Sequence, residues 1–97
     1  MQYDRVDILN AAIKHYGRDS QIDMMIEEMS ELIKALLKYR RSGYHQTLLC
    51  EIREEMADVR IMLDQMKILF GATDGEEARK IRRLSERLKM GVGNNGC

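Results

Sequence analysis

The sequence predicts an all-α protein, built as a small four-helix bundle. Two observations indicate this class. The 97-residue chain contains no Pro, 33% of its residues are charged and 5% are aromatic, a composition that favours helices over sheets. Apolar residues also recur at helical spacing in four stretches, three of which end close to a Gly. Because so short a chain buries only a modest share of its surface, we expect oligomerisation to complete the bundle.

The first two helices are marked by apolar spacing and by their ends. Residues 5–16 form the first helix, which ends where Gly17 can adopt a left-handed conformation. Ser20 is followed three residues later by an Asp, as in a capping box, so the second helix is predicted from about residue 20 to residue 41. The predicted core row of this helix is Met25, Leu32 and Leu36.

The third helix is predicted to begin between residues 44 and 47 and to end at residue 70. Its core row follows alternating steps of four and three: Ile52, Met56, Val59, Leu63, Met66 and Phe70. Asp74, three residues before Glu77, marks the start of a fourth helix. The apolar row of that helix is Ala78, Ile81, Leu84 and Leu88. We therefore expect one domain over residues 1–90 and a flexible tail over residues 91–97.

Charge and cysteine content argue against several classes of function. Sixteen acidic and sixteen basic residues give no net charge, so nonspecific binding to nucleic acids or membranes is not expected. The basic stretch 79–89 also lacks the aromatic residues of a stacking platform. No apolar run approaches the roughly 20 residues of a membrane helix. Cys50 and Cys97 form no CxxC unit and the N-terminus has no secretory apolar region, so a cytoplasmic protein is expected.

One acidic and apolar pattern occurs twice. Residues 27–32, Glu-Glu-Met-Ser-Glu-Leu, return as residues 54–59, Glu-Glu-Met-Ala-Asp-Val. Residues three apart share a helix face, so each copy presents a pair of carboxylates. The pairs are Glu28 with Glu31 and Glu55 with Asp58. Both pairs border the predicted core at matching angles, where four negative charges would repel each other unless a divalent cation lay between them.

Four carboxylates without Cys or His favour Mg²⁺ or Mn²⁺ over zinc or copper. Glu27 and Glu54 lie on the outer side of the pairs, where each can support the metal ligands, accept a proton from water, or simply face solvent. His15 and His45 do not follow a Glu by three residues, which argues against a di-iron site. Ordinary charge decoration of solvated helices is the alternative to a metal site.

The pattern Glu27-Glu28-x-x-Glu31, followed after 23 residues by Glu55-x-x-Asp58, resembles the EExxE…ExxD signature of MazG-like nucleotide pyrophosphohydrolases. The resemblance covers roughly the central half of the chain. It implies an all-α domain in a homodimer or homotetramer, with Mg²⁺ held by the last four of these acids and Glu27 as a further catalytic residue. The implied reaction cleaves a nucleoside triphosphate, ribose or deoxyribose, between its α and β phosphates.

The same resemblance implies basic residues that bind the phosphates. The candidates are Lys34, Lys38, Lys80, Arg83 and Arg87. Many members of the family carry Lys, Asn and Arg on the last helix, whereas residues 80–87 contain no Asn. Tyr16, Gln21 and Tyr39 can contact a nucleobase or serve packing and capping. The competing hypothesis is a noncatalytic helical interaction module whose apolar rows dock a partner.

Overall fold

The computed structural model describes the backbone of residues 4–96 and the side chains of residues 4–89. Its elements are α1 (Arg5–Tyr16), α2 (Arg18–Arg41), the short 3-10 helix η1 (Gln46–Leu48), α3 (Leu49–Phe70) and α4 (Asp74–Gly96). Residues 4–96 contain no strand, which confirms the all-α class. Of the helices in this range, none is both long enough and apolar enough to cross a bilayer.

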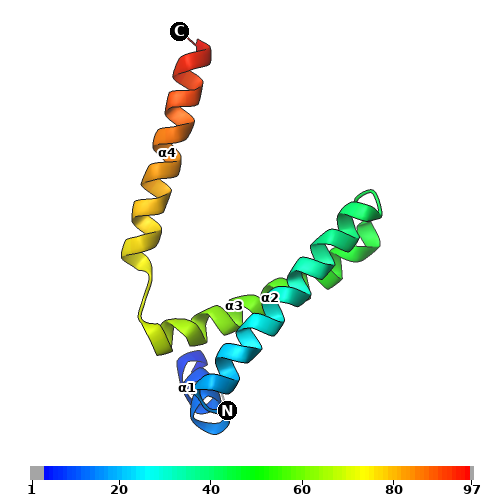
Figure 1. Cartoon of the computed structure of the whole chain (residues 1–97), viewed down its shortest axis with the longest axis vertical. Coiled ribbons are helices and arrows are strands. Elements are labelled where there is room, and N and C mark those ends of the chain that lie inside the picture. Colours follow the sequence, from blue (N-terminus) through cyan, green and yellow to red (C-terminus); the bar gives the residue numbers. More distant parts are fainter. Residues whose placement is uncertain (1–3, 97) are drawn as a thin grey trace.

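The two longest packed helices, α2 and α3, run antiparallel as a helical hairpin, and α1 packs against both near the open end of that hairpin (Figure 1). Helix α4 leaves the end of α3 and projects away from the other three helices (Figure 1). Within the described part of one chain, three helices therefore pack together and the fourth stands apart, and the bundle completed by oligomerisation stays a prediction.

Glycine conformations define the helix ends. Gly17 has φ 92° and turns the chain directly from α1 into α2, and Gly71 with φ 109° ends α3, as predicted. Because α2 begins at Arg18, the capping role predicted for Ser20 is wrong; this residue lies inside the first turn. No side chain caps the N-terminus of α2, since the N-cap position is the glycine itself.

Side chains next to the starts of η1 and α4 form hydrogen bonds at these helix ends. The His45 ring accepts a hydrogen bond from the backbone N–H of Thr47 and so caps η1. This short helix begins inside the window predicted for the start of the third helix, but α3 itself begins two residues after that window, at Leu49. Before α4, the Thr73 hydroxyl donates to the Glu77 carboxylate at 2.6 Å. The α4 backbone is helical to Gly96, beyond the predicted boundary near residue 90. Residue 97 lies outside the described residues, and the flexibility of residues 91–97 stays a prediction.

The core of the single chain is small. Its buried apolar side chains are Leu9, Met25, Ala35, Ile52 and Met62. Two polar side chains are buried with them, and the Gln21 amide donates a hydrogen bond to the Gln65 amide oxygen between α2 and α3. This bond offsets the cost of removing both amides from water. It also fixes the lengthwise register of the hairpin.

The predicted core rows are correct only in part. Met25 and Ile52 are buried as expected, but Leu36 on α2 is exposed. On α3 the predicted row members Met56, Leu63 and Phe70 are exposed as well. The α3 side chains that face α2 lie one position earlier, at Met62 and Gln65. The apolar row of α4 is also exposed, at Ile81, Leu84 and Leu88. The chain therefore carries apolar rows that it does not cover itself.

An ion pair attaches α1 to the hairpin. Two guanidinium nitrogens of Arg5 donate to the same carboxylate oxygen of Asp64, at 2.7 and 3.1 Å, and this bond lowers the pKa of the carboxyl group below its ordinary value. A small pocket nearby is lined by Arg5, Ile8, Leu9 and Ile61. Helix α1 therefore lies over the side of α3 that carries Ile61 and Asp64.

Candidate metal centre

The hairpin register brings acidic residues of α2 and α3 opposite each other. Seven residues after Gln21 on α2 comes Glu28, and seven residues before Gln65 on α3 comes Asp58. Seven residues are close to two helical turns, so both acids return to the face that the Gln pair occupies. Glu55 lies one turn further from the Gln pair on α3. One copy of the acidic repeat on each helix is thus aligned with the other.

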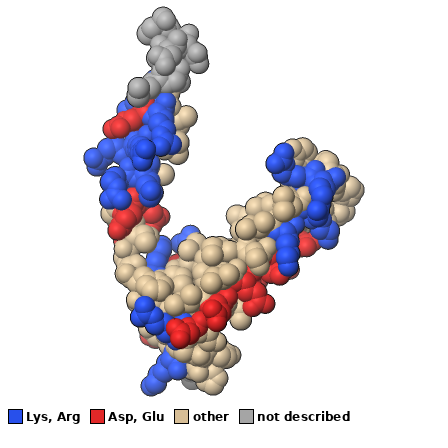
Figure 2. All heavy atoms as spheres, in the orientation of Figure 1, with Lys and Arg blue, Asp and Glu red and all other residues tan. Residues whose placement is uncertain are grey.

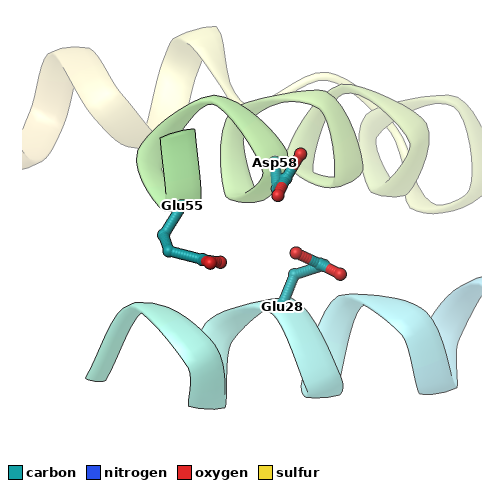
Figure 3. A group of neighbouring side chains, drawn as sticks. All are labelled: Glu28, Glu55 and Asp58. Carbon is teal, nitrogen blue, oxygen red and sulfur yellow. The ribbon is translucent and has the colours of Figure 1, made fainter. Parts of the chain in front are cut away.

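Three carboxylates converge at this point. Glu28 extends from α2 toward Glu55 and Asp58 on α3, and each residue offers an oxygen atom such that the three atoms lie within 4.8 Å of one another (Figure 3). Glu28 and Glu55 are half-buried between the helices, and Asp58 is exposed. We call these three residues the carboxylate cluster. It is the one group of three potential metal-ligating side chains found among the described residues.

The protein environment disfavours negative charge in the cluster. Partial burial raises the pKa of the Glu28 carboxyl group, and the neighbouring Asp58 and Glu55 raise it further. The pKa of Glu55 is raised in the same way, first by loss of water and then by Asp58 and Glu31. Glu28 and Glu55 are only partly covered, so both remain accessible to an ion or a substrate from solvent. A divalent cation bound between the three carboxylates would relieve the repulsion.

The fourth predicted ligand, Glu31, is not part of the cluster. Its carboxylate lies 3.4 Å from the Lys34 ammonium, one turn along α2. It is still close enough to Glu55 to contribute to the raised pKa of that residue. Glu27 is exposed and also lies outside the three converging oxygens. The structure therefore brings together three of the five predicted catalytic acids.

The predicted phosphate-binding residues divide into two groups. Lys34 and Lys38 lie on α2 beyond the cluster, where they pair with Glu31 at 3.4 Å and with Glu51 at 3.5 Å. Both ammonium groups are largely exposed and are free to exchange these partners for a phosphate. They therefore stand beside the carboxylates on the same helical hairpin.

The second group, on α4, is not brought to the cluster of its own chain. Lys80, Arg83 and Arg87 are exposed on the projecting helix. Asp58 is 12 residues before the end of α3, which corresponds to about 18 Å of helix before α4 even begins. Figure 2 shows the separation: acidic side chains line one edge of the hairpin, while basic ones gather on α4 and at the hairpin tip.

The donor set suits a hard divalent cation. The cluster offers carboxylate oxygens alone, the ligands preferred by Mg²⁺ and Mn²⁺. Neither His is available to it: His15 packs edge-on against Tyr16, with ring centres 4.7 Å apart, and His45 caps η1. Among the described residues, the cluster therefore has carboxylate donors and no His or Cys donor.

Two of the three nucleobase candidates are occupied by internal contacts. Gln21 is buried and bonded to Gln65, so its amide is not free for a base. Tyr39 packs edge-on against Tyr44, with ring centres 5.5 Å apart. Tyr16 is exposed on α1. The buried Gln pair was not predictable from the sequence, because polar residues at helical spacing normally indicate a solvated face.

Comparison of the chain with protein-family models, with curated proteins and with solved structures finds no match in any of the three. The fold and the carboxylate cluster therefore define a class of protein only in broad terms: an all-α chain with a helical hairpin that presents converging carboxylates. The family resemblance therefore rests on the sequence, and above all on its acidic pattern.

Proposed function

We propose that the chain is a Mg²⁺-dependent nucleoside triphosphate pyrophosphohydrolase, which cleaves between the α and β phosphates to give a monophosphate and pyrophosphate. The observation that carries this proposal is the convergence of Glu28, Glu55 and Asp58 from both copies of the repeated acidic pattern. The resemblance of that pattern to the MazG-like signature supplies the reaction. Mn²⁺ fits the same donor set.

In this proposal the carboxylate cluster holds the cation. The bound ion would neutralise phosphate charge and supply an oriented water. Glu31, held by Lys34 at 3.4 Å, becomes a fourth oxygen donor if that ammonium group turns to a phosphate instead. Glu27, exposed and next to Glu28 in the sequence, would accept a proton from water.

The basic residues have distinct roles in the proposal. Lys34 and Lys38 would bind the β and γ phosphates, because they extend along α2 from the cluster on the same helix. Their present partners are surface carboxylates, and exposed pairs of this kind are worth only about 0–1 kcal/mol. Exchange of Glu31 or Glu51 for a polyphosphate therefore costs little. The basic residues of α4 do not lie beside the cluster of their own chain.

The second candidate function is a noncatalytic interaction module. It is favoured by the exposed apolar rows on α2, α3 and α4, which exceed what an isolated enzyme domain needs to expose. In that case the carboxylate cluster would be an ordinary acidic edge. The two candidates differ in whether a divalent cation and a nucleotide act at the cluster.

A substrate panel tests the proposal. The full chain is incubated with each of the common ribo- and deoxyribonucleoside triphosphates and with MgCl₂, and pyrophosphate and orthophosphate are measured separately. We expect pyrophosphate with the matching monophosphate, no orthophosphate, and loss of turnover when EDTA removes the metal. Orthophosphate and a diphosphate would instead indicate cleavage between the β and γ phosphates. No product from any nucleotide with Mg²⁺ or Mn²⁺ would reject the enzyme and leave the interaction module.

A further inference from the structure

The tip of the α2–α3 hairpin carries a local positive charge. Residues 32–50 include no Asp or Glu, but they include Lys34, Lys38, Arg40 and Arg41. Figure 2 shows these basic side chains gathered at the end of the hairpin. The chain as a whole has no net charge, which is why binding to nucleic acids was not expected from the sequence. That expectation averages over the chain and does not describe the tip.

Hydrogen bonds hold the backbone of the tip in one conformation. At the end of α2, the Tyr44 N–H donates to the Tyr39 carbonyl at 3.0 Å, and the Gly43 N–H donates to the Arg40 carbonyl at 3.1 Å. This is the Schellman pattern, in which a glycine with a left-handed backbone ends the helix, and Gly43 has φ 76°. The Ser42 hydroxyl donates a further bond to the Tyr39 carbonyl at 2.8 Å. The turn is therefore formed before any ligand arrives.

Tyr44 has a backbone conformation that its residue type disfavours. Its φ is 67°, and no other non-glycine residue in the described part of the chain has a positive φ. Asn, Asp or Gly adopts this conformation at lower cost, and backbone strain of this kind is concentrated at functional sites. The phenol ring packs edge-on against Tyr39, with ring centres 5.5 Å apart, yet Tyr44 is 61% exposed. The strained position thus presents an aromatic ring to solvent.

A shallow pocket lies beside this ring. Its volume is about 320 Å³, and it is lined by Leu37, Arg40, Arg41 and Tyr44. Neither guanidinium group forms an ion pair among the side chains of residues 4–89, where other basic residues form the ion pairs. Adjacent residues of a helix point about 100° apart, so the two guanidinium groups reach the pocket from different directions. The pocket therefore combines an aromatic surface with two cations that have no internal partner there.

We propose that the hairpin tip binds single-stranded nucleic acid: one unpaired base stacks on Tyr44, and Arg40 and Arg41 bind the phosphates on either side of that base. An aromatic ring can stack on any base, and a guanidinium group binds phosphate through two hydrogen bonds. A base inside a duplex does not offer its face to the ring. A free nucleotide carries its phosphates on one side of the base only, whereas the guanidinium groups approach from two directions. The proposal does not depend on hydrolysis at the carboxylate cluster.

Fluorescence anisotropy with the full, unmodified chain tests this proposal. The probe is a labelled oligothymidylate of about 12 nucleotides, in low salt and EDTA so that no metal ion at the carboxylate cluster contributes to binding. A labelled strand of the same length built from abasic deoxyribose units carries the same phosphates without bases. We expect oligothymidylate to bind at least about 5-fold more tightly than the abasic strand, the low end of the effect of one stacked base. Equal affinities, or no binding of either strand, would overturn the proposal.

Two substitutions of Tyr44 separate stacking from folding. Tyr44→Asn removes the ring and suits the positive φ, so we expect an unchanged or higher Tm and at least about 5-fold weaker binding of oligothymidylate. Tyr44→Phe keeps the ring and should bind as the unmodified chain does. Unchanged affinity in Tyr44→Asn, or equal losses in both variants, would contradict the stacking role. If Tyr44→Asn does not fold, the comparison of the two strands with the unmodified chain still decides.

The two arginines are tested by salt dependence. Arg40→Gln with Arg41→Gln should weaken binding and reduce the slope of log K against log salt by about 1.4, because each phosphate contact to a single strand contributes about 0.7. The matched control, Arg79→Gln with Arg82→Gln, removes the same charge from exposed positions on α4 and should keep the original affinity and slope. Equal losses in the two double variants would indicate nonspecific attraction and overturn the proposal.

Competition distinguishes a strand from a free nucleotide. At the same concentration of nucleotide units, thymidine monophosphate should displace the labelled strand several-fold less effectively than unlabelled oligothymidylate does. Equal displacement would make the tip a site for free nucleotides and would overturn the proposal of a single-stranded ligand.

Discussion

Glu55→Gln and Asp58→Asn will each reduce pyrophosphate release by more than about 100-fold, the upper end of the loss seen when only a supporting partner of a metal ligand is removed. Both residues belong to the carboxylate cluster, whose oxygens lie within 4.8 Å of one another. Each substitution replaces an anionic oxygen donor by a neutral amide of the same size. The measurement is the initial rate of pyrophosphate release at saturating Mg²⁺ with the nucleotide that the unmodified chain prefers.

The matched control is Asp23→Asn, an exposed acid on α2 away from the cluster. It removes the same charge and should leave turnover unchanged. Circular dichroism of all variants separates lost chemistry from lost folding, because removing one carboxylate from the cluster lowers repulsion and should not unfold the hairpin. Full turnover in either cluster variant would reject the assignment of these residues.

A divalent cation will stabilise the folded chain through the same cluster. Without metal, confining Glu28 and Glu55 as anions disfavours the folded state, because partial burial and the neighbouring acids raise both pKa values above the ordinary 4.5 of a glutamate. Mg²⁺ at about ten times its Kd should add about 1.4 kcal/mol of stability, or about 6–11 °C in Tm at fixed protein concentration. EDTA should remove this gain.

The pH dependence follows from the direction of the pKa shifts. A carboxyl group with a raised pKa in the folded state binds more protons there than in the unfolded chain, so its contribution to stability falls as pH rises from about 4.5 through the raised value. Without metal, Glu28→Gln should therefore have a higher Tm than the unmodified chain at pH 7.5. That difference should shrink as pH falls toward 4.5.

Asp23→Asn serves again as the control, because it should show neither the pH-dependent gain nor a reduced response to Mg²⁺. The contrary result is that Glu28→Gln melts at the same temperature as the unmodified chain at pH 7.5 and responds equally to Mg²⁺. That result would show that repulsion within the carboxylate cluster does not lower the stability of the folded chain. A stabilising effect of Mg²⁺ that disappears in Glu28→Gln would support a shared ion.

Helix positions were predictable from the sequence because apolar spacing and glycine are local signals. Helix α1 spans its predicted residues, and the ends of α2 and α3 lie where a glycine permits a positive φ. The start of α2 was predicted two residues late, since Gly17 ends one helix and begins the next without a loop. When a Ser and an Asp with capping spacing lie inside a helix, their positions do not show where that helix begins.

Which apolar row faces the other helix could not be predicted. Helix α3 has Met62 and Leu63 in adjacent positions, and periodicity favours the row that contains Leu63, because it is the more regularly apolar of the two. The structure buries Met62 together with Gln65, a polar residue that only a partner on α2 makes tolerable. The more regular apolar row was mistaken for the internal core, and its members Met56, Leu63 and Phe70 are exposed in the structure.

The repeated acidic pattern predicted three of the residues that converge in the carboxylate cluster, but it also predicted Glu31, which does not join them. A repeated pattern on two antiparallel helices brings its copies together only if the register allows it, and the Gln21–Gln65 bond sets a register that does. Glu31 shares a helix face with Glu28 but pairs with Lys34. Residue spacing alone does not tell whether Glu31 pairs with this lysine or binds a metal ion. Contacts between helices, not periodicity within one, decide which acids converge.

The central claim is that Glu28, Glu55 and Asp58 bind one divalent cation between α2 and α3. Its most direct test is the anomalous difference map of crystals grown with Mn²⁺, which scatters anomalously where Mg²⁺ does not. The account predicts one strong peak per chain, within bonding distance of all three carboxylates. Mn²⁺ bound elsewhere, or no peak between the two helices at millimolar Mn²⁺, would contradict it.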